Sequence, residues 1–157
     1  MFDNIINKYV RNLLRGLFLD DYNVLIEWDM SPSQLKDKIS VFDSFFVLNY
    51  TSKLVSYNIE SKLFDSHNTF AISFNYMREK MKSVNIWQKQ MKMPLYKNFE
   101  EMQIFLESKL GKPNYARSVK KLFRDKDDVV YIWKRKNVKI EHQLFDLKSR
   151  ETLEILL

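Results

Sequence analysis

Hydrophobic residues recur at three- and four-residue spacing near the start of the chain and at alternate positions further along. Residues 2–18 carry an apolar stripe of helical period, with basic and amide side chains on the opposite side. This pattern predicts an amphipathic helix that Asp20 and Asp21 end. Its basic side is compatible with a membrane surface, but burial against a sheet is the commoner outcome for such a stripe.

Period-two alternation begins near residue 54 and predicts a β-hairpin. Residues 54–63 and 69–76 alternate apolar and polar side chains, and the segment between them has turn chemistry. Residues 22–29 predict an earlier strand, and the Ser-Pro-Ser segment at 31–33 predicts the start of a helix that continues to about residue 40. The pattern of residues 41–50 is compatible with either a helix or a buried strand.

The second half of the chain combines helical and strand patterns. Residues 77–97 predict a helix that loosens before Pro94. Asn98 and Glu101 form a capping-box-like start for a helix, and Gly111 with Pro113 predicts its end. Residues 114–124 predict one further short helix, and residues 129–134, 138–147 and 152–157 predict an antiparallel meander.

Together these elements predict a single domain over residues 1–157 with an α+β fold: a single antiparallel sheet of about five strands with helices packed on one face. No run approaches the 18 consecutive apolar residues of a membrane span, and charged residues interrupt the first apolar stretch before a secretory signal forms. The absence of cysteine excludes disulfides and thiolate sites and is compatible with a cytoplasmic location. The oligomeric state stays open.

The chain has two glycines, two histidines and no cysteine, which excludes many of the common catalytic, phosphate-binding and metal-binding motifs. The two glycines, Gly16 and Gly111, lie far apart in the sequence, and no Walker loop, dinucleotide fingerprint or nucleophile elbow is present. His142 falls on the apolar side of its predicted strand, where packing in the core is the usual role, and His67 falls in a turn. We therefore expect a protein that is not an enzyme, holds no cofactor or metal, and works through its surface.

Charge is divided unevenly along the chain. Residues 1–77 have a formal net charge of −2, whereas residues 78–157 have +8. The densest basic stretch, residues 112–139, is interleaved with aromatic residues and suits an acidic protein or a nucleic-acid backbone, although a solvated face also explains it. Three aspartates at 125, 127 and 128 would repel phosphate within it. The predicted partner-binding residues are Tyr115, Arg117, Lys120, Lys121, Arg124, Trp133 and Arg135.

A metal-dependent nuclease is a third interpretation. Glu60 and Lys62, with Asp43 upstream, imitate the acidic-x-Lys arrangement with which restriction-like nucleases hold a divalent cation and activate water. The pattern is short and recurs at residues 107–109, inside a predicted helix. The acidic cluster around the first strand (Asp20, Asp21, Glu27 and Asp29) is adequately explained by helix capping and solubility.

The run from Phe99 to Ile155 combines the helix end Leu106-Glu-Ser-Lys-Leu110-Gly111-Lys-Pro113, Trp133 on a strand, the segment Ile140-Glu-His-Gln-Leu144 and a final strand with Glu154-Ile155. In this arrangement it resembles small bacterial immunity proteins of contact-dependent inhibition and other polymorphic toxin systems. The resemblance implies a cytoplasmic, non-enzymatic protein that neutralises a cognate toxin domain by direct binding, and it carries over no functional residue. Because antidotes to nucleases are usually acidic, this basic chain implies a toxin with an acidic surface or binding through the acidic first half. Nucleic-acid binding through the basic half is the alternative.

Overall fold

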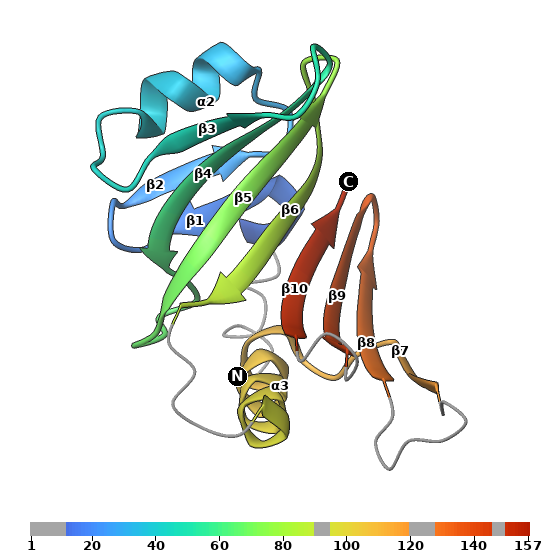
Figure 1. Cartoon of the computed structure of the whole chain (residues 1–157). Helices are drawn as coiled ribbons and strands as arrows, with labels where there is room; N and C mark the ends of the chain where they lie inside the picture. Colours follow the sequence, from blue (N-terminus) through green and yellow to red (C-terminus); the bar gives the residue numbers. More distant parts are fainter. Residues whose placement is uncertain (1–11, 90–94, 120–127, 146–149) are drawn as a thin grey trace.

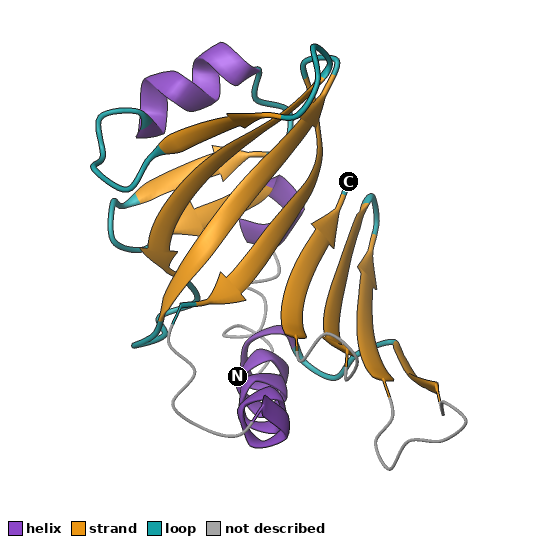
Figure 2. Cartoon of the chain, viewed as in Figure 1, coloured by secondary structure: helices purple, strands orange, loops and turns teal. Residues whose placement is uncertain are grey.

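The computed structural model describes residues 12–89, 95–119, 128–145 and 150–157 (Figure 1). Most of the described chain is strand (Figure 2). An antiparallel sheet of eight strands in the order β3-β4-β5-β6-β10-β9-β8-β7 dominates, and β1 and β2 form a separate two-stranded sheet. The prediction of a single sheet of about five strands is therefore wrong, because segments assigned to helices or left ambiguous supply further strands.

The elements have the following bounds. The large sheet contains β3 (Phe46–Asn49), β4 (Leu54–Lys62), β5 (Thr69–Met77), β6 (Lys80–Gln88), β7 (Tyr115–Val119), β8 (Asp128–Arg135), β9 (Val138–Phe145) and β10 (Arg150–Leu156). The other elements are β1 (Gly16–Leu19), β2 (Val24–Glu27), α2 (Pro32–Ile39) and α3 (Leu95–Leu110).

The large sheet has an apolar inner face and a polar outer face, because successive side chains of a strand alternate between the two. One inner row crosses four neighbouring strands through Ile59, Ile72, Ile86 and Leu153. The adjacent outer row consists of Asn58, Ser73, Asn85 and Glu154. Apolar residues of β1, β2, α2 and α3 join the inner face in one buried cluster.

The hairpin of β4 and β5 and the start of α2 confirm two sequence predictions. The Ser31 hydroxyl accepts a hydrogen bond from the Gln34 N–H at 3.3 Å, and the Gln34 side chain accepts one from the Ser31 N–H at 2.9 Å. This reciprocal capping box satisfies two backbone donors, with Pro32 at the first helical position.

The predicted helix over residues 2–18 is wrong from Gly16 onward. Residues 12–15 are helical, residues 2–11 lie outside the described residues, and β1 begins at Gly16. A Cβ atom at Gly16 would lie 2.1 Å from the backbone oxygen of Ile26. The backbone of β2 therefore passes position 16 at a distance that only glycine permits.

A strand, β6, occupies residues 80–88 of the helix predicted over residues 77–97, so that prediction is wrong there, and residues 90–94 lie outside the described residues. Asn75 pairs with Ser83 and Tyr76 with Met81, so Lys82 is the extra residue of a β-bulge. Because of the bulge, the buried side chains of Met81 and Val84 lie three residues apart. The bulge interrupts the period-two alternation by which a strand is recognised in the sequence.

Helix α3 carries the chain from β6 to the far edge of the sheet. It begins at Leu95, slightly earlier than predicted, and ends before Gly111, whose φ of 80° is the left-handed conformation expected there. The chain continues as strand β7 where residues 114–124 predict a helix, so that prediction is wrong for the described part of the segment. Strands β8, β9 and β10 then return as the predicted meander and place β10 beside β6 (Figure 1).

None of the helices in the described ranges combines the length and the apolar character that a membrane crossing requires.

Candidate partner-binding surface

Strand β3 forms one edge of the large sheet and exposes large apolar side chains. Phe46 and Leu48 are 52% and 43% exposed on the outer face, Val47 is 37% exposed, and Tyr50 just after the strand is 60% exposed. The strand sequence Phe-Val-Leu-Asn contains no charged residue. Natural edge strands usually carry charges that prevent pairing with other chains. An uncharged, apolar edge is instead suited to binding an extended segment.

The backbone of β3 also presents hydrogen-bonding groups at this edge. The Tyr50 N–H donates to the Leu54 carbonyl at 3.0 Å, so Tyr50 belongs to the set of residues whose backbone groups face β4. In an antiparallel pair these groups alternate between the partner strand and the opposite side. Val47 and Asn49 therefore direct their N–H and C=O groups to the open edge.

Side chains hold the segment that leads into β3. The Phe42 ring stacks on the Tyr22 ring with centroids 3.8 Å apart. The Tyr22 hydroxyl donates to the Glu60 carbonyl at 2.9 Å, and the Ser44 hydroxyl accepts from the Glu60 N–H at 3.1 Å. These contacts continue the pairing of β4 to the segment that precedes the first residue of β3. The edge is thus ordered before a partner arrives, which lowers the entropic cost of binding.

Two of the predicted partner-binding residues lie at the opposite edge. Tyr115 and Arg117 are exposed on β7, and they pair with Ile132 and Val130 of β8. Both side chains therefore lie on the outer face. They remain available to a partner, at the other end of the strand order from β3.

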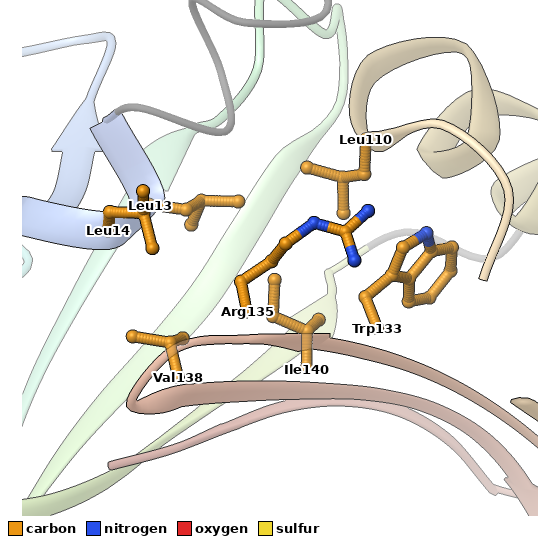
Figure 3. Close-up of a pocket in the computed structure, with 7 residues that line it drawn as sticks. All are labelled: Leu13, Leu14, Leu110, Trp133, Arg135, Val138 and Ile140. Atoms are coloured by element: carbon orange, nitrogen blue, oxygen red, sulfur yellow. The ribbon is translucent and has the colours of Figure 1, made fainter. Parts of the chain in front are cut away.

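Trp133 and Arg135 lie on the inner face, so the predicted set is divided between the two faces of the sheet. Trp133 is fully buried and its Nε1–H donates to the Gly111 carbonyl at 2.8 Å, which contradicts its predicted role as a surface anchor. Figure 3 shows Arg135 and Trp133 beside Leu110 in a small, mainly apolar pocket. The Arg135 guanidinium donates to the side-chain oxygen of Asn114 at 2.7 Å.

The remaining predicted residues, Lys120, Lys121 and Arg124, lie outside the described residues. Elsewhere in the basic half, charge is partly neutralised on the outer face. Lys139 forms a salt bridge of 2.8 Å with Glu141. Of the described basic residues, Arg117, Lys134 and Lys139 share the outer face, whereas Arg135 lies on the inner face.

The residues of the nuclease hypothesis do not converge on a cation site. Glu60 forms a salt bridge with Lys89, and Lys62 and Asp43 are exposed. Across the residues that the structure describes, no group of three or more acidic or histidine side chains is placed to hold a metal ion.

The most chemically distinctive cluster is a buried polar network beneath α3. His142 is fully buried, and its Nε2 atom lies 2.8 Å from a Glu151 carboxylate oxygen. Glu151 also accepts hydrogen bonds from the Asn98 and Gln88 side chains at 2.8 and 3.1 Å. The Phe99 ring stacks on His142 with centroids 4.2 Å apart. The network thus joins α3 to β6, β9 and β10.

Burial lowers the pKa of His142, although the hydrogen bond and the charge of Glu151 oppose this shift. The ring is therefore neutral near pH 7, with Nε2–H donating to Glu151. Its Nδ1 atom lies 2.7 Å from Gln103 Oε1, and Nε2 of the same amide has no hydrogen-bond partner among the described residues. Exchange of the two amide ends would let Gln103 donate to Nδ1. Both ring nitrogens are occupied and the ring has no contact with solvent, so His142 holds α3 in place rather than transferring protons to a substrate.

Sequence reasoning left residues 41–50 open between a helix and a buried strand, and it missed the exposure of β3 because Phe45 to Leu48 are apolar without a period, as in a buried element. One signal was present. The Thr-Ser-Lys segment at 51–53 precedes a clear strand, and two strands joined by so short a turn pair as a hairpin. Exposure of the run, however, depends on β3 being the last of the described strands at its edge of the sheet, which no local pattern specifies.

Comparison with protein-family models, curated proteins and solved structures gave no match to this chain.

Proposed function

We propose that this chain is a non-catalytic binding protein that pairs the free edge of β3 with an extended segment of another protein. The observation that carries the proposal is the exposed, uncharged strand Phe46–Asn49, whose backbone groups at Val47 and Asn49 face outward. Addition of a strand would satisfy these groups and cover Phe46 and Leu48 in one step. The partner class we propose, from the resemblance of residues 99–155, is a bacterial toxin domain neutralised in the cytoplasm.

The alternative is a nucleic-acid-binding protein that uses the basic half. Tyr115 and Arg117 on the outer face of β7 support it, because an exposed ring and a guanidinium suit stacking and phosphate contact. The burial of Trp133 and the pairing of Lys139 with Glu141 count against it. Strand addition at β3 therefore has the stronger geometric support.

The direct test uses Val47→Pro. Proline removes the outward N–H of Val47 without removing a hydrogen bond to β4, so the fold should persist. A partner captured from the native host is purified, and its affinity is measured for the wild type, for Val47→Pro and for Arg117→Glu. We expect Val47→Pro to weaken binding by about tenfold or more, since one backbone bond and strand alignment are lost, and Arg117→Glu to have little effect.

Each other outcome has a distinct meaning. Loss of binding in Arg117→Glu alone would show that the interface lies at β7 rather than at β3. A captured partner that is not a toxin would refute the immunity function while leaving strand addition in place. A wild-type dimer that Val47→Pro converts to a monomer would show that a second copy of this chain occupies the edge. Salt-sensitive binding of a generic oligonucleotide, weakened by Arg117→Glu, would favour the nucleic-acid alternative.

A further inference from the structure

A polar pocket of about 410 Å³ lies between the start of α2 and two hairpin turns. The turn before β4 contributes Lys53, and the turn between β5 and β6 contributes Arg78 and Glu79. The Arg78 N–H donates to the Lys53 carbonyl at 2.9 Å, which joins the two turns. The volume falls within the range of pockets that bind small molecules.

Positive charge predominates around this pocket. Lys36, Lys53 and Arg78 line it against a single acidic residue, Glu79. Neither Lys53 nor Arg78 forms a salt bridge with any residue in the described part of the chain. The first turn of α2 also borders the pocket, and the N–H of Ser33 there has no acceptor within the helix. A helix N-terminus beside three cationic side chains is a favourable environment for an anion.

Tyr57 supplies an independent indication of a ligand. Its side chain lines the pocket and is only 6% exposed, and its hydroxyl forms no hydrogen bond with any described residue. By contrast, the hydroxyl of the neighbouring Tyr76 donates to the Met30 carbonyl at 2.8 Å. Burial, followed by the negative charge of Glu79, raises the pKa of Tyr57, so the phenol keeps its proton. The side chain is buried but the hydroxyl oxygen itself is not enclosed, so it reaches the pocket as a protonated donor that makes no hydrogen bond within the described residues.

We infer that this pocket binds the phosphate group of a small phosphorylated molecule. The Tyr57 hydroxyl and the Ser33 N–H donate to phosphate oxygens, while Lys36, Lys53 and Arg78 neutralise the dianion. Glu79 opposes the ligand and limits its affinity. The pocket lies beside β3, because its lining residues Val55 and Tyr57 pair with Asn49 and Val47. None of the groups that bind phosphate belongs to the free edge of β3, so the inference does not rest on the proposed function.

The test is isothermal titration calorimetry on the full chain with inorganic phosphate and with phenyl phosphate, and with acetate as a monocarboxylate control. Tyr57→Phe removes only the hydroxyl, and we expect it to weaken phosphate binding about tenfold. Glu79→Gln removes the opposing charge, and we expect it to strengthen binding about threefold. This gain is important because a variant that merely disturbs folding would not bind more tightly.

Lys80→Gln is the matched control, since Lys80 is exposed beside the same turn but does not line the pocket. It should change the affinity by less than about twofold. The inference is overturned if neither phosphate compound binds in the millimolar range, if Tyr57→Phe binds like the wild type, or if Lys80→Gln weakens binding as much as Tyr57→Phe does. Binding of inorganic phosphate with exclusion of phenyl phosphate would overturn the assignment to a phosphorylated molecule.

Discussion

Replacement of His142 by glutamine tests the charge state of the network that holds α3. In the wild type the ring lies between Glu151 and Gln103 and stacks on Phe99. Glutamine retains an amide donor for Glu151 but loses the stacked ring and cannot titrate. At pH 7.5 we expect the variant to be less stable by about 1–2 kcal/mol, the scale of one aromatic contact and one weakened bond to a carboxylate.

The pH dependence of the free energy of unfolding distinguishes a neutral His142 ring from a charged one. Burial lowers the pKa of His142 below its ordinary value of 6.5, so the folded state keeps a neutral ring while the unfolded chain binds a proton below that pH. The wild type therefore has this contribution to stability above pH 6.5 and loses it as the pH falls through the lowered pKa. Between pH 7.5 and 5.5 the loss amounts to up to about 1.4 kcal/mol, the free energy of protonating one unfolded histidine over that interval.

Urea unfolding of both proteins at pH 7.5 and 5.5 measures this difference directly. The wild type should lose more stability on acidification than His142→Gln does, by up to about 1.4 kcal/mol. If the wild type instead gains stability relative to the variant, His142 is an imidazolium paired with Glu151, and our assignment of a neutral ring is refuted. An NMR titration of the folded protein gives an independent check, because the ring signals of His142 should titrate below its ordinary pKa of 6.5.

Two further predictions concern backbone positions. Gly16→Ala should lower the free energy of unfolding by about 2–4 kcal/mol, because the new methyl group meets the backbone of β2. Gly111→Ala should lower it by only about 1 kcal/mol, because alanine is strained at the left-handed φ of that position. Equal losses in urea unfolding would contradict this account of Gly16. Combining Arg78→Asn with Glu79→Gly should raise stability by about 1–2 kcal/mol, since both residues have positive φ in a two-residue hairpin turn that favours Asn-Gly. The same variant should lose phosphate binding, because Arg78 is removed. A rise in melting temperature with phosphate binding retained would show that the turn residues do not contribute to the pocket.

The elements that were predicted correctly are those in which local chemistry and tertiary context agree. The alternation of β4 and β5 matches a sheet with one apolar face, and the cap of α2 is complete within four residues. The errors have local physical causes. The bulge at Lys82 interrupts the alternation of β6, and the contact at Gly16 ends the first helix earlier than its apolar stripe indicates. Neither cause is visible without the partner strand.

The candidate site was less accessible to sequence reasoning than the fold. Charge and aromatic content drew attention to residues 112–139, yet whether a side chain such as Trp133 reaches the surface depends on which face of β8 it occupies and on what covers that face. The exposed run in β3 resembles core by composition, and the pocket at Tyr57 assembles residues 31–79 from separate turns. Sites made by long-range pairing leave no contiguous signature in the sequence.

The position of β10 has a consequence for how this molecule is made. Strands β3 to β6 and strands β7 to β9 precede it in the chain, yet among the described strands only β10 bridges the two groups, through its pairing of Leu153–Leu156 with Ser83–Ile86. While the meander is being synthesised, one edge of β6 is unpaired. Helix α3 then covers only part of the surface that it packs against in the complete sheet. The halves can unite only after the final strand has been synthesised, so a nascent chain stalled before β10 would be a strong candidate for chaperone capture.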